Sequence, residues 1–349
     1  MKSRVFLAAA GILALLAGPA SAAKYKIHWY VGHQNPDYFE VAAKEFKADV
    51  EKRSHGEIEV EIMTATNDES HNGAGSAAQI AAMVEKGEAE MGHSFTDVVG
   101  ELDPRLYAFE APYLFRDYRH MEGVLEGPVG EELLEGFRAH HMVGLSFTYS
   151  GGASAVATTD RQIRRPEDLK GLKVGVYGDA VNEAWLKSLG ATPVAIAHDV
   201  LSVQGLVRGG ALDALVVTWQ NFSRASLHKD FKYINLPGST YLVSVTYINE
   251  KFFESLPEAY RTLIKEASRT AGRIERVKTI ELNETAKRAM MAKGVRPVGL
   301  TDAGKRGFLQ ALAPAYERSL SGLIGKDFIK RIRDTADGPE RRTDVAALD

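Results

Sequence analysis

The sequence predicts an α/β fold with two lobes, each a mostly parallel sheet flanked by helices, and one long helix that spans both lobes. Strand-like and helix-like segments alternate in two separate stretches, which is typical of a parallel sheet covered by helices. The chain has 349 residues, a length that fits two lobes of ordinary size better than a single core. Residues 257–294 carry an apolar pattern at helical spacing. At about 1.5 Å per residue this helix would be roughly 55 Å long.

The first 22 residues are expected to be a signal peptide rather than part of the fold. Lys2 and Arg4 form a positive segment, and Ala20-Ser21-Ala22 fits a cleavage site. The apolar run between them, "VFLAAAGILALLAG", is too short to span a membrane. We therefore expect an exported chain that is cleaved near Ala22 and resides in the periplasm. The sequence contains no cysteine, so the fold must be stabilised by its core and not by disulfides.

The first lobe is expected to contain residues 23–149 together with about 240–256. Its opening strand leads to Asn35 and Pro36, a good helix N-cap followed by proline at the first helical position. Apolar side chains then recur at helical spacing at Phe39, Ala42, Phe46 and Val50. The expected elements are, in order, a strand at 26–32, a helix after Pro36, a strand at 57–63, a helix at 76–85 and a strand at 89–97.

The second lobe is expected to contain residues 150–239 with part of 280–349, and it follows the same alternation. Glycines mark the helix ends here, because Gly190 and Gly209 each follow an apolar helical pattern. The expected elements are a strand at 173–177, a helix at 180–189, a strand at 193–197, a helix at 199–208 and a strand at 211–219. The helix at 257–294 then connects the two lobes.

Ligands of open α/β sheets collect at the carboxyl ends of the strands, so the loops at these ends predict a binding cleft. Aromatic, amide and acidic residues dominate the loops, a mixture that suits a small polar ligand. Trp219 ends a buried strand, so both core packing and a ligand wall are consistent with it, whereas core packing explains Trp185 better. The strand ends predict as ligand-binding residues Tyr30, His33, Asp68, Glu69, Asn72, Phe95, Asp97, Tyr177, Asp179, Trp219 and Asn221.

The motifs for catalysis and for cofactors are weak. "GHSFT" (92–96) lacks the second glycine of a nucleophile elbow, and "GAGSAA" (73–78) does not directly follow its strand as a dinucleotide motif would. The pairs His28 with His33 and His93 with Asp97 form no recognised metal-ligand set. The sequence contains no stripe of basic residues that would indicate binding to nucleic acid. We expect no enzymatic activity, no metal, no cofactor and no nucleic-acid partner.

Four segments resemble one family of solute receptors when they are taken together. They are "RRPEDLKGLKVGVYGDAVNEAWLKSLGATPVAI", "LYAFEAPYLFRDYRHMEGVLEGPVGEELL" (106–134), "VVTWQNFSRASLHKDFKYI" (216–234) and "YINEKFFESLPEAYRTLI" (247–264). In this order and spacing they are similar to the solute-binding proteins of tripartite ATP-independent periplasmic (TRAP) transporters, the DctP-type family. The resemblance implies two lobes closing on one small organic solute, which a monomeric receptor delivers to the membrane subunits of an ion-driven symporter.

The same resemblance directs attention to two positions that carry no charge. Members usually bind a ligand carboxylate with an arginine after Gly-Leu-Lys-(Ile/Val), and many have a second arginine in a preceding segment. These positions correspond to Gly175 and Ser154, which therefore join the candidate ligand-binding residues. One hypothesis is an acid held by Arg224, by the amides at 72–76 or by a metal ion. The other is an amine, a zwitterion or a neutral solute, because an unpaired buried arginine would be costly.

Two further functions remain open from the sequence. A ligand sensor with a signalling partner has the same sequence features as a transport receptor, whereas an exported hydrolase lacks a recognisable nucleophile, base or metal set. Neighbouring genes for two membrane subunits would favour transport, and a neighbouring sensor kinase would favour signalling.

Overall fold

The computed structural model describes residues 23–31, 39–64, 77–176, 180–196, 200–236 and 238–338. In this part of the chain the strands form a ten-stranded sheet with the order β2-β1-β3-β9-β4-β7-β5-β6, and β8 joins β10 to the side of β4. The strands are β1 (Tyr25–Val31), β2 (Ile58–Met63), β3 (Met91–Phe95), β4 (Met142–Thr158), β5 (Lys173–Val176), β6 (Thr192–Ala195), β7 (Ala214–Thr218), β8 (Tyr233–Asn235), β9 (Tyr241–Asn249) and β10 (Arg296–Val298).

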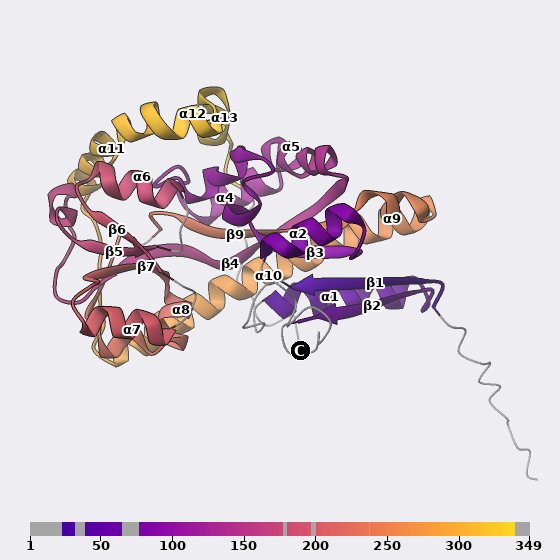
Figure 1. Cartoon of the computed structure of the whole chain (residues 1–349), viewed down its shortest axis with the longest axis horizontal. Helices are drawn as coiled ribbons and strands as arrows, with labels where there is room; N and C mark the ends of the chain where they lie inside the picture. Colours follow the sequence, from indigo (N-terminus) through magenta and orange to yellow (C-terminus); the bar gives the residue numbers. More distant parts are fainter. Residues whose placement is uncertain are drawn as a thin grey trace, which may run out of the picture.

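The helices surround this sheet (Figure 1). They are α1 (Phe39–Arg53), α2 (Ala77–Lys86), α3 (Thr96–Val99), α4 (Tyr118–Leu125), α5 (Pro128–Gly136), α6 (Ala180–Ser188), α7 (Val200–Arg208), α8 (Trp219–Arg224), α9 (Glu250–Ser255), α10 (Glu258–Ala292), α11 (Asp302–Ala315), α12 (Ser321–Ile324) and α13 (Lys326–Asp334). Figure 1 places α6 and α7 on opposite faces of β5, β6 and β7, so these strands are covered on both sides. The α/β fold with its long helix is thereby confirmed.

Two strand ends differ from the sequence prediction. The strand expected at 211–219 ends at Thr218, because the Thr218 side chain caps α8 by accepting from the Asn221 amide at 3.3 Å. Trp219 is therefore the first residue of a helix and not the last of a strand. The strand expected at 89–97 likewise ends at Phe95, and Asp97 lies in the short helix α3.

The sheet is parallel at its two sides and antiparallel at its centre, so the expectation of mostly parallel sheets is only partly right. β1 pairs in parallel with β2 and β3, and β5 pairs in parallel with β6 and β7. The long strands β4 and β9 pair with each other and with the inner neighbours in antiparallel fashion. The predicted alternation treats each half as a separate set of strands and helices. It does not include these two strands, which both halves share.

β4 passes from one half of the sheet to the other through an irregular segment. Its first part pairs with β9 up to Tyr149, the register then shifts before Gly152, and the part from Ser154 onward pairs with β7. Gly151 and Gly152 have φ angles of +119° and +69°. A Cβ atom at Gly152 would lie 2.5 Å from the Tyr118 hydroxyl oxygen. Glycine is therefore required here both by the backbone conformation and by the close approach of a neighbour.

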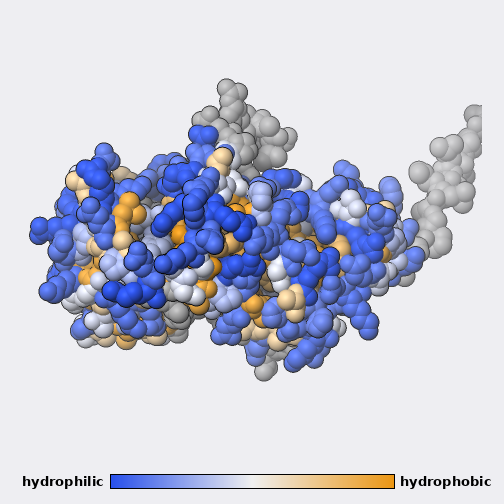
Figure 2. Space-filling model, turned by 90° about the horizontal axis from the view of Figure 1, so that it is seen from above, coloured by the Kyte–Doolittle hydropathy of each residue, from blue (hydrophilic) through white to orange (hydrophobic). Residues whose placement is uncertain are grey.

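α10 contributes to the apolar cores of both halves. Ile264 and Ala267 pack in the cluster formed with α1, β1 and β2, whereas Ala286 and Met290 pack in the cluster around β7 and α8. The helix also packs along β4 between these ends. In the described residues no helix has the length and apolar character of a membrane span, and the face in Figure 2 is mainly hydrophilic.

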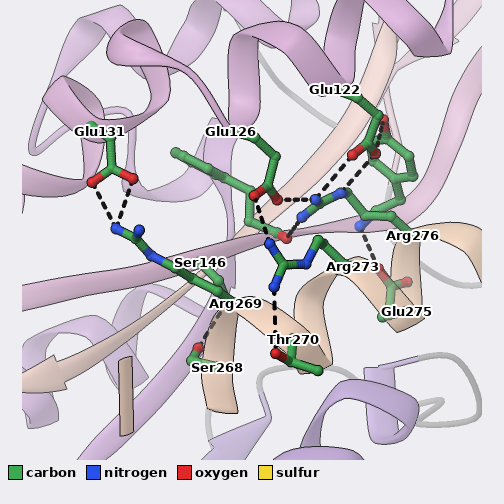
Figure 3. Close-up of polar contacts among 12 residues, drawn as sticks. Glu122, Glu126, Glu131, Ser146, Ser268, Arg269, Thr270, Arg273, Glu275 and Arg276 are labelled. Atoms are coloured by element: carbon green, nitrogen blue, oxygen red, sulfur yellow. Dashed lines mark hydrogen bonds and ion pairs between the residues drawn. The ribbon is translucent and has the colours of Figure 1, made fainter. Parts of the chain in front are cut away.

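A buried ion-pair network fixes the middle of α10 (Figure 3). Arg276, only 1% exposed, donates from Nε and Nη2 to the two carboxylate oxygens of Glu122 on α4, at 2.8 and 3.0 Å. Its Nη1 donates to the carbonyl oxygen of Phe147 on β4 at 2.6 Å, and Nη2 also pairs with Glu126. A buried guanidinium needs such complete pairing, because desolvation of an unpaired charge is costly.

Glu275 lies next to this network without a cation of its own. Its Oε2 accepts from the Tyr149 amide at 2.7 Å and its Oε1 accepts from the Thr279 hydroxyl at 2.6 Å. Complete burial raises the pKa of the Glu275 carboxyl to about 8, although the two hydrogen bonds and Arg276 act in the opposite direction. Glu122 and Glu126 already balance the nearby positive charge of Arg276, so the neutral acid form of Glu275 suits the site at physiological pH.

The raised pKa of Glu275 predicts a specific pH dependence of stability. Because the folded chain binds this proton more tightly than the unfolded chain, the stabilisation is complete below the ordinary pKa of 4.5 and is lost as pH rises through about 8. Glu275→Gln mimics the neutral acid. The unfolding free energy of the wild type should therefore fall, relative to the variant, by a few kcal/mol between about pH 5 and 8.5, at about 1.4 kcal/mol per pKa unit.

Urea unfolding at several pH values measures this difference. Glu284→Gln, at an exposed position of the same helix, is the matched control and should follow the wild type. Parallel pH profiles for the wild type and Glu275→Gln would contradict the assignment.

Candidate functional site

A small cavity, partly open to solvent, lies where β3, β5 and β7 end beside the crossing strands. Both halves of the sheet contribute to it, with β3, α3 and β9 on one side and β5, α6, β7 and α8 on the other. Its described lining residues are Phe95, Asp97, Glu110, Ser154, Val176, Asn182, Val216, Val217, Thr218, Asn221 and Leu242.

The start of α8 places two polar side chains of this lining. Thr218 is the N-cap of α8, and Asn221 follows in the first helical turn. Ser154 lies opposite Thr218 in the β4–β7 pairing, and its amide donates to the carbonyl of Thr240 at 2.9 Å. The passage of β4 between the sheet halves therefore brings Ser154 and Asn221 to one wall.

A second polar group lies on the side of α6. Glu110, 3% exposed, accepts from Nδ2 of Asn182 at 3.0 Å. Oδ1 of Asn182 accepts in turn from the indole nitrogen of Trp185 at 2.7 Å, which fixes the orientation of the amide. Trp185 is core, as the sequence indicated, and it also positions a residue of the cavity. The arrangement presents a buried carboxylate and an amide to whatever occupies the cavity.

Four of the predicted site residues meet at this cavity, namely Phe95, Asp97, Ser154 and Asn221. Tyr30 and Trp219 lie elsewhere, since both are buried in apolar clusters and neither is among the described lining residues. The Trp219 ring packs edge to face on Phe222, with ring centroids 6.3 Å apart. The predicted residues outside the described part of the chain are His33, Asp68, Glu69, Asn72, Tyr177 and Asp179, together with the amides at 72–76.

Gly175 faces away from the described cavity lining. A Cβ atom there would lie 3.1 Å from Cδ1 of Leu215 and 3.4 Å from Cδ1 of Ile196, in the apolar layer beside α7. The next residue, Val176, lines the cavity, as strand alternation requires. An arginine at 175 would therefore leave the strand on its apolar face. Arg224 is the last residue of α8, one turn beyond Asn221, and is not among the described lining residues.

Sequence reasoning missed Glu110 and Asn182. Glu110 stands alone among apolar residues in "LYAFEAPYLF", and a single carboxylate in such a segment is a signal that it has a specific partner. Asn182 belongs to the predicted helix 180–189, but nothing in the sequence indicates which helical face meets the cavity.

Two of the histidines considered for metal binding, His28 and His93, lie within the described residues and have other partners. His28 Nδ1 lies 2.7 Å from a carboxylate oxygen of Glu90, and His93 Nε2 lies 2.7 Å from the Thr148 hydroxyl. Burial lowers the pKa of His93 to about 3. Among the described residues no group of three or more His, Asp or Glu side chains is arranged to hold a metal ion.

Comparison with known proteins decides the family. The profile of the bacterial extracellular solute-binding proteins, family 7, matches residues 31–322. The chain belongs to this family. The resemblance to DctP-type solute receptors of TRAP transporters is thereby confirmed, and such a protein is a receptor and not an enzyme.

Relatives and solved structures agree with this assignment. A solute-binding protein of Verminephrobacter eiseniae is 27% identical over 297 residues, which cover 84% of each chain. A TRAP periplasmic solute binding protein from Ochrobactrum anthropi has a similar fold, with a TM-score of 0.80, 19% identity, and coverage of 89% of this chain and 94% of that one. Another, from Bradyrhizobium sp. btai1 b in complex with galacturonate, has a TM-score of 0.75 and 25% identity, and covers 89% and 100%.

The position of Trp219 predicts that its removal affects stability first. Trp219→Ala should lower the unfolding free energy by about 3 kcal/mol or more, because a buried tryptophan leaves a cavity that the surroundings fill only in part. Denaturant unfolding followed by circular dichroism measures the loss. A variant that keeps wild-type stability and loses only ligand affinity would make Trp219 a ligand wall instead.

Proposed function

We propose that this chain is the periplasmic receptor of a TRAP symporter, binding one small polar organic solute in the described cavity and delivering it to the membrane subunits. The observation that carries the proposal is the position of the cavity, which takes its lining from both halves of the sheet at the strand ends of a family 7 fold. The receptor is proposed to act as a monomer, with its signal peptide removed near Ala22.

The proposed lobes are residues 23–149 with about 240–256, and 150–239 with part of 280–349. The irregular segment of β4 at Gly151 and Gly152 lies next to the proposed boundary, where β4 pairs with the other central strand, β9. A hinge at this place would let the two walls of the cavity close on a solute.

Closure predicts a change of shape. Small-angle scattering should give a smaller radius of gyration for the solute-saturated receptor than for the empty one, because the open cleft contracts. An unchanged radius at saturation, with binding verified in the same sample, would rule out lobe closure.

The charge of the cavity supports a cationic or zwitterionic solute, or a neutral polar one. Its described lining contains the carboxylates of Asp97 and Glu110 and neither lysine nor arginine. An ammonium group beside the Glu110 carboxylate and the Phe95 ring would find both a counter-charge and an aromatic face.

An organic acid is the second candidate, and the relatives favour it. The Bradyrhizobium protein was solved in complex with galacturonate, and a 24% identical Escherichia coli relative is named a 2,3-diketo-L-gulonate-binding protein. An acid receptor built on this chain would need a cation such as Arg224, or backbone amides, in place of the arginines expected at 154 and 175.

A thermal-shift panel distinguishes the two candidates. Choline, glycine betaine, putrescine and amino acids represent the first, and succinate and D-galacturonate the second. A solute at about 100 times its Kd adds roughly 2.7 kcal/mol of stability, so a true ligand should raise Tm by several degrees. We expect the hits among the amines and zwitterions.

Glu110→Gln is the matched test of the charge argument. It keeps the size of the side chain and its contact with Asn182, and should weaken a cationic hit at least about tenfold, because a desolvated charge pair loses one partner. Glu88→Gln, exposed on the first half, should leave affinity unchanged. Stabilisation by carboxylates alone, with Glu110→Gln binding them as well or better, would establish the acid receptor.

A further inference from the structure

One face of α10 contacts the irregular segment of β4. Glu275, Thr279 and Asn283 are spaced four residues apart, so they lie in one row along the helix. Glu275 accepts from the Tyr149 amide, and the Thr279 hydroxyl lies 3.4 Å from the Tyr149 carbonyl oxygen. These contacts place Asn283, the last of the row, beside the glycines where β4 changes partners.

The amide of Asn283 joins two separate parts of the backbone. Its Nδ2 donates to the carbonyl oxygen of Gly151 and, at 3.1 Å, to that of Thr279. Its Oδ1 accepts from the backbone amide of Gln220, in the first turn of α8, at 3.0 Å. The side chain is 6% exposed, so these bonds are formed away from water.

Both joined parts lead directly to the cavity. Gly151 precedes the lining residue Ser154 by three positions, and Gln220 immediately precedes the lining residue Asn221. The β4–β9 register skips from Tyr149 to Gly152, so Gly151 has no Cα partner on β9 in the described pairing. The Asn283 side chain joins Gly151 of β4 to the first turn of α8, a connection that the β4–β9 pairing does not make. Asn283 itself is not among the described lining residues of the cavity.

We propose that Asn283 is a positioning residue of the solute site, which fixes Ser154 and Asn221 relative to each other by holding Gly151 and the first turn of α8 on one amide. The inference rests on the proposed function, since it takes the described cavity to be the solute site. Because α10 packs in the cores of both sheet halves, the Asn283 link also joins the wall of the cavity to the element that connects them. Loss of the link should loosen the wall while both cores stay intact.

Two variants distinguish the hydrogen bond from Asn283 to Gly151 from the hydrogen bond that Asn283 accepts from Gln220. Asn283→Asp keeps an oxygen that accepts from the Gln220 amide but loses the donor to Gly151, whereas Asn283→Ala loses both. Thr285→Ala is the matched control, because Thr285 is exposed on the same helical turn and contacts only Arg288 among the contacts described.

A spectroscopic readout near the link distinguishes positioning from general destabilisation. The chain has three tryptophans, and Trp219 directly precedes Gln220, whereas Trp29 lies in the core of the other sheet half. In protein labelled with 5-fluorotryptophan, Asn283→Ala should shift or broaden the Trp219 fluorine resonance and leave that of Trp29 unchanged. Asn283→Asp should have a smaller effect on Trp219. Amide exchange at Gln220 should be accelerated in Asn283→Ala and not in Thr285→Ala.

Affinity gives the functional outcome, with glycine betaine and D-galacturonate as the probes. Whichever probe binds the wild type should bind Asn283→Ala at least about fivefold more weakly when the protein is fully folded, because the buried hydrogen bonds that fix the cavity wall are lost. An unchanged Trp219 resonance with unchanged affinity, and only a lower Tm, would overturn the proposal. The fluorine and exchange measurements use protein alone, so failure of the solute panel would count against the proposed function without altering their result.

Discussion

The contact of α10 with β4 sets how the two halves of the sheet are joined. Arg276 is almost completely buried, and it is stable there because Glu122, Glu126 and the Phe147 carbonyl together satisfy its charge and its donors. Removing one partner of such a pair is expected to cost about 3–5 kcal/mol, because the remaining charge stays buried. The network therefore fixes the register of the long helix against the crossing strand.

That register decides where the polar row of α10 meets β4. With Arg276 held against α4, the helical repeat directs Glu275, Thr279 and Asn283 to the segment in which β4 leaves β9 for β7. The two glycines of that segment permit the turn, and side chains of α10 supply hydrogen bonds to it. The proposed hinge is compatible with a well-defined cavity wall in this arrangement, because side chains of α10 hydrogen-bond to Tyr149 and Gly151.

The electrostatics of the cavity are the basis of the proposed departure from the carboxylate clamp that the family resemblance implies. The described lining is acidic and amide-rich, and its one nearly buried charge, Glu110, is oriented by Asn182 and Trp185. A buried carboxylate in a ligand cavity repels an anionic solute and attracts a cationic one, and water screens neither effect strongly at such a depth. The family fixes the architecture, whereas these side chains set the proposed preference among solutes.

Local sequence determined the elements and the class of fold. The apolar periodicity of 39–53 and 258–292 is local, and these helices and the helix predicted at 76–85 agree with the structure to within a few residues. Four lining residues of the cavity are also among the residues that the sequence predicted, Phe95, Asp97 and Asn221 from strand ends and Ser154 from family resemblance. Packing between distant segments, in contrast, turns Gly175 and Trp219 toward apolar layers and brings Glu110 and Asn182 to the cavity. These outcomes depend on which face of a strand or helix meets a neighbour that is distant in sequence. They also depend on the antiparallel pairing of β4 with β9 across about a hundred residues, and packing rather than a local sequence signal sets that pairing.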